Sequence, residues 1–453
     1  MRRFWVPFVI ALIGAGSALV SARVFTLRQA VQFALTHNSA TSVARAKERI
    51  AQDEGRLAHA EGRPRATVSY GYLFSNNPLE ALSAELERRQ VTAQAFAPSV
   101  LNHPGTTRLG TTTLSLSWPL YTGGAVDDAI RAGDWGQKAA RGLAQRTREH
   151  VIAGVVQAYE GLAMAQAARH IAREAVAAAA RHARTTSYLL AHGRIVRSDA
   201  LTASVNLGAN KELLAEAVSD VETARENLAL AMGTPAGVII RIARGPLTIP
   251  TLPQQSLPYY LQAALAHRPD VRALRAETHM MRARVRAARA QSSIHVSLMA
   301  QSQWFSETPA LRHNAWTVGA VISKSLYGGG QARDRADVLR ERMAEADGKL
   351  AGLKSRIDYQ VVTAYENLRT AARRYHLAQK NVARARRTVA LVDRRYGEGR
   401  AILLELLNSE QALVQAREQE LGALYALARN RTGLADACGT LSLKSLPSWQ
   451  ASS

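Results

Sequence analysis

Four segments of the chain alternate apolar and polar residues with the two-residue period of a β-strand. They come in two pairs, one pair in each half of the chain. The apolar positions are Val68, Tyr70, Tyr72 and Phe74, then Leu114, Leu116 and Trp118, then Ile294, Val296 and Leu298, and finally Trp316, Val318, Ala320 and Ile322. Each run is about ten residues long, which is the length and period of a tilted membrane-spanning strand. A half-buried strand of a soluble sheet has the same local pattern, so the alternation alone leaves both open.

A long helical stretch follows each strand pair. No proline occurs from Ala125 to about Leu190, or from Gln331 to about Tyr396. Helices of roughly 65 residues would be about 100 Å long, a length found in coiled coils and helical tubes rather than in ordinary globular domains. A turn at residues 192–193 and another at residues 398–399 reverse the chain. Return helices then end near Gly233 and Gly433.

The chain is an internal duplication. Residues 155–162 match residues 361–368 at six of eight positions, and Tyr-Thr-Gly-Gly at 121–124 recurs as Tyr-Gly-Gly-Gly at 327–330, in both cases 206 residues later. Each half opens with helix, broken at residues 37–38 or 268–269, and Thr26 with Gln29 has the pattern of a capping box. The first half contains 24 extra residues between its two strands, at about 75–108, for which we expect a short helix at 79–94.

Composition narrows the class of protein. The 58 Lys and Arg against 36 Asp and Glu give a net charge of +22, which first suggests nucleic acid. Residues 1–22 argue against that partner, because Arg2 and Arg3, an apolar stretch and small residues have the pattern of a secretory signal peptide. The single cysteine, Cys438, excludes an intramolecular disulfide framework and a Cys-ligated metal site. We find no catalytic site, no cofactor motif and no His-x-x-x-His metal pair.

These patterns divide the chain into five parts. They are the signal peptide (1–22), a first repeat (23–232), a Pro/Gly-rich connector (233–258), a second repeat (259–436) and a tail (437–453). Four strands cannot close a barrel, and open sheet edges are not viable in lipid. If the strands lie in a membrane, several chains must therefore contribute them.

The duplicated order of helix, strand pair, Tyr-x-Gly-Gly, very long helix, Gly-Arg turn and return helix resembles the TolC-like outer-membrane efflux channel family. The resemblance implies a mainly α homotrimer with a small transmembrane β part. It implies a twelve-stranded β-barrel in the outer membrane of a Gram-negative bacterium, four strands per chain, and an α-helical barrel across the periplasm. It also implies a periplasmic adaptor (membrane fusion protein) and an inner-membrane RND or ABC transporter, working in efflux or type I secretion. The exported substrate stays open.

Candidate site residues gather at the two hairpin turns. Asp199 and Glu405 lie six residues after Gly193 and Gly399, at matching places in the two halves, so a trimer would hold six carboxylates near an aperture. A solvated acid at a helix start is the alternative interpretation. The resemblance places Tyr–Asp–Arg contacts here, for which the candidates are Tyr396, Arg194, Arg197 and Arg400. It also implies that Gly193 and Gly399 meet the adaptor.

Glycines also mark the passage from strand to long helix. They are Gly123, Gly124, Gly328, Gly329 and Gly330, and we expect them to serve as sharp turns. The second run lacks the Gly-Lys-Ser/Thr ending of a phosphate-binding loop, so a nucleotide site is not supported. The rival hypothesis for the whole chain is an exported coiled-coil scaffold or adhesin without a pore. A protein of that class does not require four matched strands with alternating apolar and polar residues.

Overall fold

The structure is a computed structural model that describes residues 23–234, 240–243, 255–308 and 310–443 of the 453-residue chain. The predicted signal peptide, most of the predicted connector and the end of the predicted tail lie outside the described residues. The chain forms two compact units. Unit 1 comprises residues 1–43, 146–268 and 357–453, and unit 2 comprises residues 44–145 and 269–356. Each unit therefore takes segments from both halves of the duplicated sequence.

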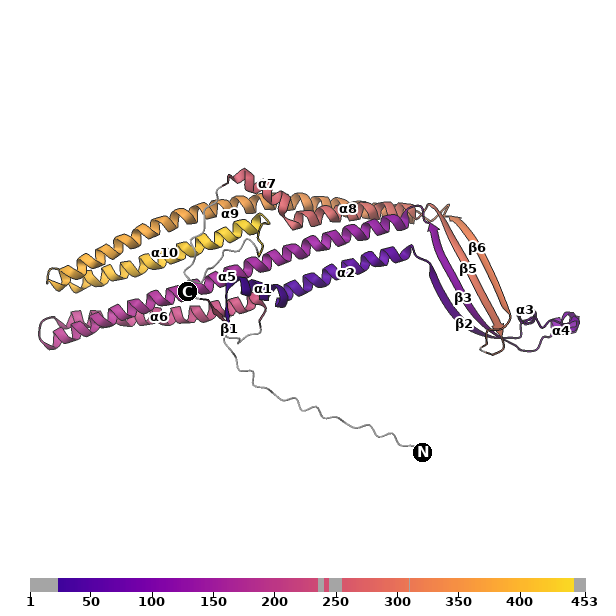
Figure 1. Ribbon diagram of the computed structural model, residues 1–453, viewed down its shortest axis with the longest axis horizontal. Helices are drawn as coiled ribbons and strands as arrows, with labels where there is room; N and C mark the ends of the chain where they lie inside the picture. Colours follow the sequence, from indigo (N-terminus) through magenta and orange to yellow (C-terminus); the bar gives the residue numbers. More distant parts are fainter. Residues whose placement is uncertain (1–22, 235–239, 244–254, 309, 444–453) are drawn as a thin grey trace, which may run out of the picture. The chain divides into compact units, whose positions relative to one another are not determined.

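Unit 2 contains one antiparallel sheet with the strand order β2-β3-β5-β6 (Figure 1). The strands are β2 (Arg65–Ser75), β3 (Thr107–Tyr121), β5 (Ile294–Ser306) and β6 (Asn314–Lys324), and they confirm the four predicted strands. The central pairing joins β3 to β5, with Leu114 opposite Ser302. The two halves of the sequence thus complete a single sheet, and β2 and β6 form its edges.

The strands of unit 2 continue into long helices. These are α2 (Ser39–Glu61), α5 (Ala125–Ala191), α8 (Pro269–Ala290) and α9 (Gln331–Gly397). Helices α5 and α9 are 67 residues each, about 100 Å, which confirms the two predicted long helices. Glycines allow close helix contact, because a Cβ on Gly133 of α5 would lie 3.0 Å from the Cα of Gly55 in α2. No helix in the described part of the chain combines the length and apolar composition needed to cross a bilayer.

The sheet has a helix end, where its strands join the long helices, and a loop end, where loops connect β2 to β3 and β5 to β6. The extra residues of the first half fold at the loop end (Figure 1). They form α3 (Pro78–Glu87), a 3₁₀ turn (Ala93–Phe96) and α4 (Pro98–Asn102). The single helix expected at 79–94 is therefore wrong in extent. It ends at Glu87, and Arg89, two residues later, has a left-handed φ of 57°. The buried Arg88 donates to the Ala84 carbonyl and pairs with Glu307 beside β5, which ties the insertion to the sheet.

Unit 1 contains the two helical hairpins and a small core. Its elements are β1 (Arg23–Phe25), α1 (Leu27–His37), α6 (Arg197–Met232), β4 (Ile240–Ile242), α7 (Leu257–His267), α10 (Leu403–Ala437) and the distal parts of α5 and α9. Val31 of α1, Leu162 of α5 and Leu228 of α6 are almost completely buried together in the core. The predicted capping box is present, with Thr26 and Gln29 bonded reciprocally.

One expectation for unit 1 needs correction, and two features of this unit were not predicted. The second return helix does not end near Gly433 but runs on to Ala437, and the left-handed glycine that follows is Gly439. The parallel pair of β1 and β4 was not predicted, since three-residue strands are too short to show alternation. Glu160 is only 3% exposed, whereas its repeat partner Glu366 is exposed and pairs with Arg369.

Candidate functional site

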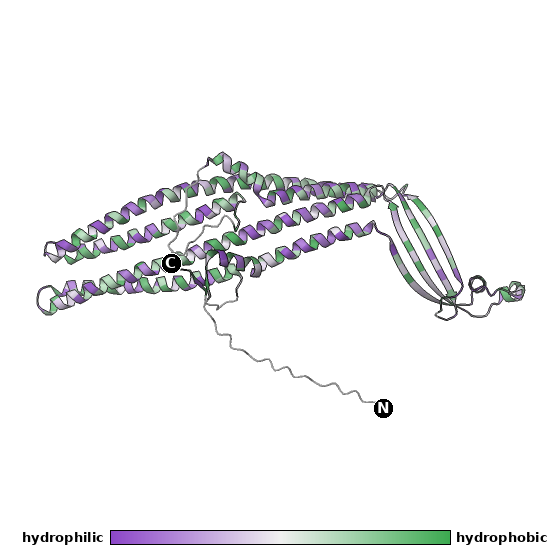
Figure 2. Cartoon of the chain, viewed as in Figure 1, coloured by the Kyte–Doolittle hydropathy of each residue, from purple (hydrophilic) through white to green (hydrophobic). Residues whose placement is uncertain are grey.

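The sheet of unit 2 has two chemically different faces. Directly opposed residues share a face, so the register assigns every side chain. One face carries Val68, Leu114, Leu298, Val318 and Ile322, and Figure 2 shows the alternation along each strand. The other face is mostly hydroxyl and amide, with Thr67, Ser69, Thr113, Ser115, Gln301, Gln303 and Thr317. Its side chains suit water, and those of the first face suit lipid.

The apolar face is highly exposed and lacks charge along its length. Val68 is 71% exposed, Trp316 73% and Ile322 72%. Within the strands as described, charged residues on this face occur only at the ends, Arg108 at the loop end and Lys324 at the helix end. Arg108 lies 5.7 Å from the centre of the Phe74 ring. An exposed apolar band of this size on a water-soluble surface would be strongly unfavourable.

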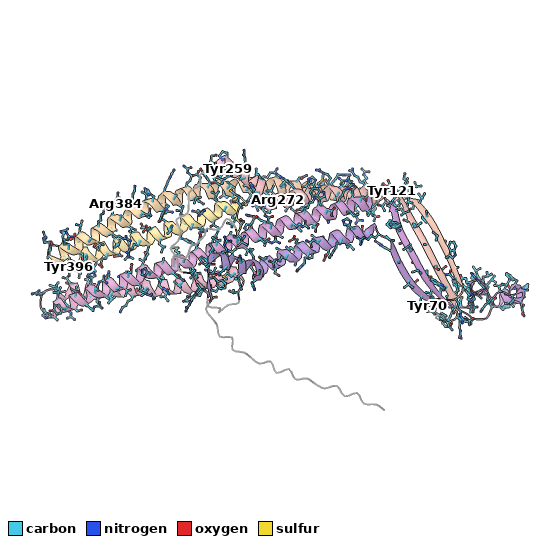
Figure 3. All side chains as sticks on the ribbon, in the orientation of Figure 1. Tyr70, Tyr121, Tyr259, Arg272, Arg384 and Tyr396 are labelled. Atoms are coloured by element: carbon cyan, nitrogen blue, oxygen red, sulfur yellow. The ribbon has the colours of Figure 1, made fainter. Side chains whose placement is uncertain are left out.

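Aromatic side chains flank the apolar face at both ends. Tyr72, Phe74, Trp304 and Trp316 lie toward the loop end, and Trp118 lies toward the helix end, where Tyr121 is also found (Figure 3). An 11-residue strand such as β2 is about 37 Å long, and a tilt of about 45° reduces its rise to about 26 Å. That rise matches the apolar band of an outer-membrane strand, which aromatic girdles commonly border.

Both edges of the sheet present unpaired backbone groups. Within the part of the chain that the structure describes, β2 pairs only with β3, and β6 pairs only with β5. Every residue of β6 is exposed, and so is nearly every residue of β2. Backbone amides and carbonyls without partners are not tolerated in lipid, so these edges require strands from another chain if the apolar face contacts a membrane.

The glycine turns join sheet to helix. Gly123, Gly124, Gly329 and Gly330 all have left-handed φ angles, of 63°, 88°, 61° and 82°, while Gly328 does not. A side chain on Gly123 would meet a second obstacle, because its Cβ would lie 2.2 Å from the Ser293 Cβ. Four of the five predicted turn glycines therefore have a conformation that disfavours any L side chain.

The hairpin turns of unit 1 have the same backbone feature. Gly193 and Gly399 adopt φ angles of 66° and 70°, and a Cβ on either would meet no atom within 4 Å. The glycines are thus required by the turn itself and leave an open surface at the tip. Tyr396 lies at the second turn (Figure 3).

The structure brings some of the candidate residues together. Burial and the carboxylate of Asp199 raise the pKa of Tyr396, which places these side chains, from different hairpins, in the same electrostatic environment. Tyr396 also packs on a small core of Ala203, Leu403 and Leu407. Among the described residues, Asp199 makes no side-chain hydrogen bond or ion pair. Arg194 and Arg197 lie beside the first turn, and among the described residues neither makes a hydrogen bond to Tyr396.

Glu405 has a partner that was not predicted. Arg395 donates to the Glu405 carboxylate at 3.2 Å and to the Arg400 carbonyl at 3.2 Å, while Arg400 pairs with Glu398 in its own turn. The arginine that binds Glu405 is thus Arg395 and not Arg400. The duplication gave no signal for this residue, because the matching position in the first half is Leu189. Spacing across the turn, with Arg395 ten residues before Glu405, was the available clue.

Two ion pairs connect the hairpins above the turns. His182 of α5 lies 2.8 Å from Glu410 of α10, and Arg417 of α10 lies 2.6 Å from Glu174 of α5. The hydrogen bond from Glu410 raises the pKa of His182, with burial acting in the opposite direction. These contacts hold α5 and α10 together from residues far apart in the chain. No sequence motif indicated them.

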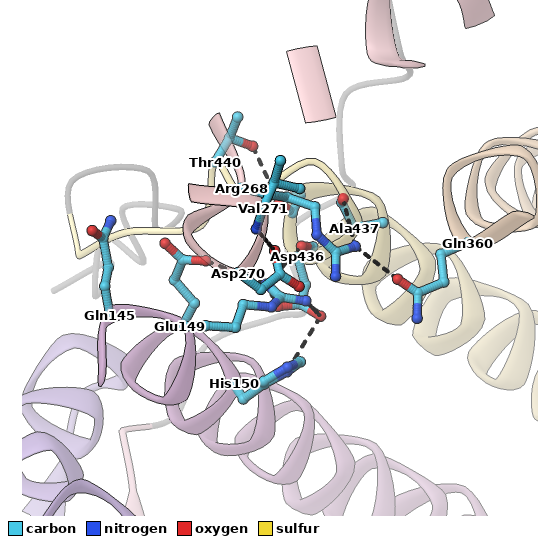
Figure 4. Close-up of polar contacts among 12 residues, drawn as sticks. Gln145, Glu149, His150, Arg268, Asp270, Val271, Gln360, Asp436, Ala437 and Thr440 are labelled. Atoms are coloured by element: carbon cyan, nitrogen blue, oxygen red, sulfur yellow. Dashed lines mark hydrogen bonds and ion pairs between the residues drawn. The ribbon is translucent and has the colours of Figure 1, made fainter. Parts of the chain in front are cut away.

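Unit 1 contains further buried charge at Arg146 and Arg268, where one of its chain segments begins and ends (Figure 4). Arg268 is 3% exposed and donates to Gln360 at 2.7 Å and to the Ala437 carbonyl. Asp436 pairs with Arg146 at 2.8 Å and lies 3.6 Å from His150. Since these partners come from α5, α9 and α10, the network binds both hairpins to one centre.

The described part of the chain contains no cluster of three or more His, Cys, Asp or Glu side chains that could hold a metal ion. Cys438 is buried, and burial raises the pKa of its thiol to about 11, which makes it a poor nucleophile or ligand at neutral pH. The features described above are the two faces of the sheet, the glycine turns and the contacts between the hairpins.

Comparisons with known proteins agree on one family. The model of the outer membrane efflux protein family matches residues 30–234 and 260–440. The cobalt-zinc-cadmium resistance protein CzcC of Cupriavidus metallidurans is 26% identical over 317 residues, covering 69% of this chain and 73% of CzcC. The CmeC outer membrane channel of Campylobacter jejuni has a TM-score of 0.75 at 19% identity and covers 91% of this chain and 85% of its own. The open MtrE outer membrane channel of Neisseria gonorrhoeae has a TM-score of 0.74 at 18% identity, covering 92% and 91%.

Proposed function

The chain belongs to the outer membrane efflux protein family, and on this premise we propose that it is the exit channel of a tripartite efflux system. The protein is an outer-membrane channel that extends into the periplasm, and it is not an enzyme. In the proposed system, a periplasmic adaptor links it to an inner-membrane RND or ABC transporter. That transporter supplies the energy and selects the substrate.

One observation carries this proposal: the exposed sheet has a lipid-compatible face, a water-compatible face and two unpaired edges. In lipid, β2 of one chain must pair with β6 of the next, since both edges need backbone partners. Three copies would give twelve strands and remove every edge. The hydroxyl and amide face then lines an aqueous passage, and the apolar face contacts the membrane.

The long helices extend this passage away from the membrane. The hairpin turns lie at the far ends of α5 and α9, so they form the periplasmic end in this arrangement. Asp199 and Glu405 from three chains would place six carboxylates there. Carboxylates confined in a narrow aperture repel anions and favour cations. Arg395 partly compensates Glu405, which leaves Asp199 as the stronger contributor to this field.

Adjacent residues of β6 provide a matched test of the channel. Val318 lies on the apolar face and Thr317 on the polar face. We expect Val318→Arg to prevent assembly in the outer membrane, because arginine near the bilayer midplane costs about 2–4 kcal/mol per site. We expect Thr317→Arg to assemble and to shift the ion preference of the pore toward anions. The assays are outer-membrane fractionation, the heat-modifiable trimer on SDS gels, and single-channel conductance in planar bilayers.

The rival scaffold hypothesis makes a different forecast for this pair. A pore-free coiled-coil protein would show no conductance, and the two arginine variants would behave alike in fractionation. That result would refute the channel proposal.

A substitution at a turn glycine tests whether the adaptor binds at the hairpin turns. Asparagine tolerates a left-handed φ, so Gly193→Asn is expected to preserve the turn while adding a side chain to the open tip. We expect normal trimers and conductance but loss of efflux, measured as increased susceptibility of cells to a panel of drugs and metal ions. The matched control is Gly208→Asn, at an exposed helical position where a Cβ also meets nothing within 4 Å. Full efflux by Gly193→Asn would argue against adaptor contact at this turn.

A further inference from the structure

Helix α8 carries a continuous line of basic side chains on its exposed side. Successive spacings of three and four residues place them on a single helix face. They are Arg272, Arg275, His279, Arg282, Arg286 and Arg289, and all six are exposed. The line extends over about 25 Å of the helix. We name these six residues the α8 basic stripe.

Helix α5 broadens the stripe into a surface. Trp135 of α5 stacks on His279 with ring centres 4.5 Å apart, and Lys138 lies 3.9 Å from the centre of the Trp135 ring. Arg131 of α5 is 61% exposed and shares the carboxylate of Asp128 with Arg286, at 2.9 and 2.8 Å. The surface therefore combines seven arginine and lysine side chains with the stacked rings of Trp135 and His279.

Carboxylates compensate part of this charge. Asp128 binds Arg131 and Arg286, and the two arginines hold its pKa below the ordinary value despite burial. Asp347 of α9 accepts a hydrogen bond from Thr278, and the exposed Asp127 and Asp134 of α5 lie four residues before Arg131 and Lys138. The acidic residues of α8 itself, Asp270 and Glu277, lie on the opposite side of the helix from the stripe, as their spacing requires. Arginine and lysine side chains still outnumber the carboxylates around them, so the surface keeps a net positive charge, which favours a polyanionic ligand.

The α8 basic stripe lies on the opposite side of α8 from a hollow in unit 2. A hollow of about 640 Å³ is lined from α2, α5, α8 and α9 by small residues such as Ala132 and Gly136, together with Met280 and Arg284. The α8 residues that line the hollow, such as Met280 and Arg284, are rotated by about 150° about the helix axis from the stripe. This step rests on the proposed function: the hollow belongs to the passage wall, and the stripe lies on the outside of the channel.

We propose that the α8 basic stripe and its α5 neighbours bind the carboxylate-bearing polymer of the cell wall. Arginine recognises carboxylates through paired, charge-assisted hydrogen bonds, and a row of arginines matches a ligand with repeated carboxylates. Lipid phosphates are the weaker match. The headgroup region is only about 5–8 Å deep on each side of the bilayer, so a line about 25 Å long that runs along the helix mostly lies beyond it.

The test compares two triple variants with the same change in charge. Arg275→Gln, Arg282→Gln and Arg289→Gln remove half of the stripe, and Arg284→Gln, Arg335→Gln and Arg342→Gln remove three arginines that line the hollow. Full-length channel in detergent is sedimented with isolated cell-wall sacculi at low and high salt. We expect salt-sensitive binding by the native protein, about tenfold weaker binding by the stripe variant, and binding within about twofold of native by the hollow variant.

Two further binding experiments identify the ligand. Sacculi whose carboxyl groups have been amidated with carbodiimide and a neutral amine are expected to lose the binding. Vesicles containing phosphatidylglycerol are expected to bind the native and stripe-variant channels equally. Loss of vesicle binding with unchanged sacculus binding would overturn the proposal in favour of lipid, and equal losses in the two triple variants would overturn it as a nonspecific charge effect. Bilayer conductance of the same preparations is measured separately, so absence of a pore would refute the proposed function and not the stripe.

Discussion

The contact between His182 and Glu410 predicts that acid strengthens the link between the two hairpins. His182 lies on α5 and Glu410 on α10, 2.8 Å apart, with side chains only 17% and 22% exposed. The Glu410 hydrogen bond raises the pKa of His182, with a smaller contribution from Asp393, while Arg181 and burial act against it. Because the pKa in the folded state is raised, the stabilisation is fully present below the unfolded value of about 6.5. It is lost as the pH rises through the folded pKa.

The size of the effect follows from the geometry. A charge-assisted hydrogen bond contributes about 1.5–3 kcal/mol, and removal of both partly buried groups from water offsets part of it. We therefore expect about 1–2 kcal/mol at about pH 6, which is a change of about 5–30-fold in the equilibrium for local opening of the hairpins. At about pH 9 the imidazole is neutral and most of this contribution disappears.

Hydrogen exchange measured by mass spectrometry provides the assay. Native channel, His182→Gln, Glu410→Gln and the double variant form a double-mutant cycle, and peptides that cover both hairpins are compared at about pH 6 and pH 9 after correction for the chemical exchange rate. Arg417→Gln is the matched control, because the Arg417–Glu174 pair at 2.6 Å connects the same helices without a histidine as its inter-helix partner. A coupling energy that is equal at the two pH values, or below about 0.5 kcal/mol at pH 6, would refute the reasoning.

Three other outcomes are expected. Asp199→Ala combined with Glu405→Ala should reduce the cation preference of single channels in a salt gradient, and an unchanged reversal potential would contradict the aperture role. Gly123→Ala should destabilise the protein by about 2–4 kcal/mol in thermal unfolding, because strain at positive φ adds to the clash with Ser293, whereas Gly71→Ala in an open strand position should cost much less. Burial raises the pKa of Glu160 from 4.5 to about 7, so stability should fall by up to about 3 kcal/mol as the pH rises across that interval. Glu160→Gln should abolish that slope, and a slope that persists would assign it elsewhere.

Much of the fold could be predicted from the sequence because its signals are local. Alternation predicted the four strands, absence of proline predicted α5 and α9, and glycines predicted the turns after them. The local signals failed where a helix end depends on tertiary contact. Thus Gly433 lies inside α10, and α3 ends early where Arg88 binds Glu307.

The candidate site was less accessible from sequence. Matched positions in the two repeats directed attention to Asp199 and Glu405, but the partner of Glu405 is Arg395, which has no counterpart in the first half. The burial of Glu160 and the pairing of His182 with Glu410 also break the symmetry of the duplication. A repeated sequence does not produce repeated environments, because the two copies pack against different neighbours.

By itself the sequence determined which segments are strand, helix and turn, since backbone preference and side-chain period are properties of neighbouring residues. Only the tertiary structure decided that β3 pairs with β5 and that the arginines of α8 lie opposite the hollow of unit 2. Strand order and the environment of each helix face depend on contacts between residues far apart in the chain. Those contacts are selected by the packing of the whole molecule, and no local pattern encodes them.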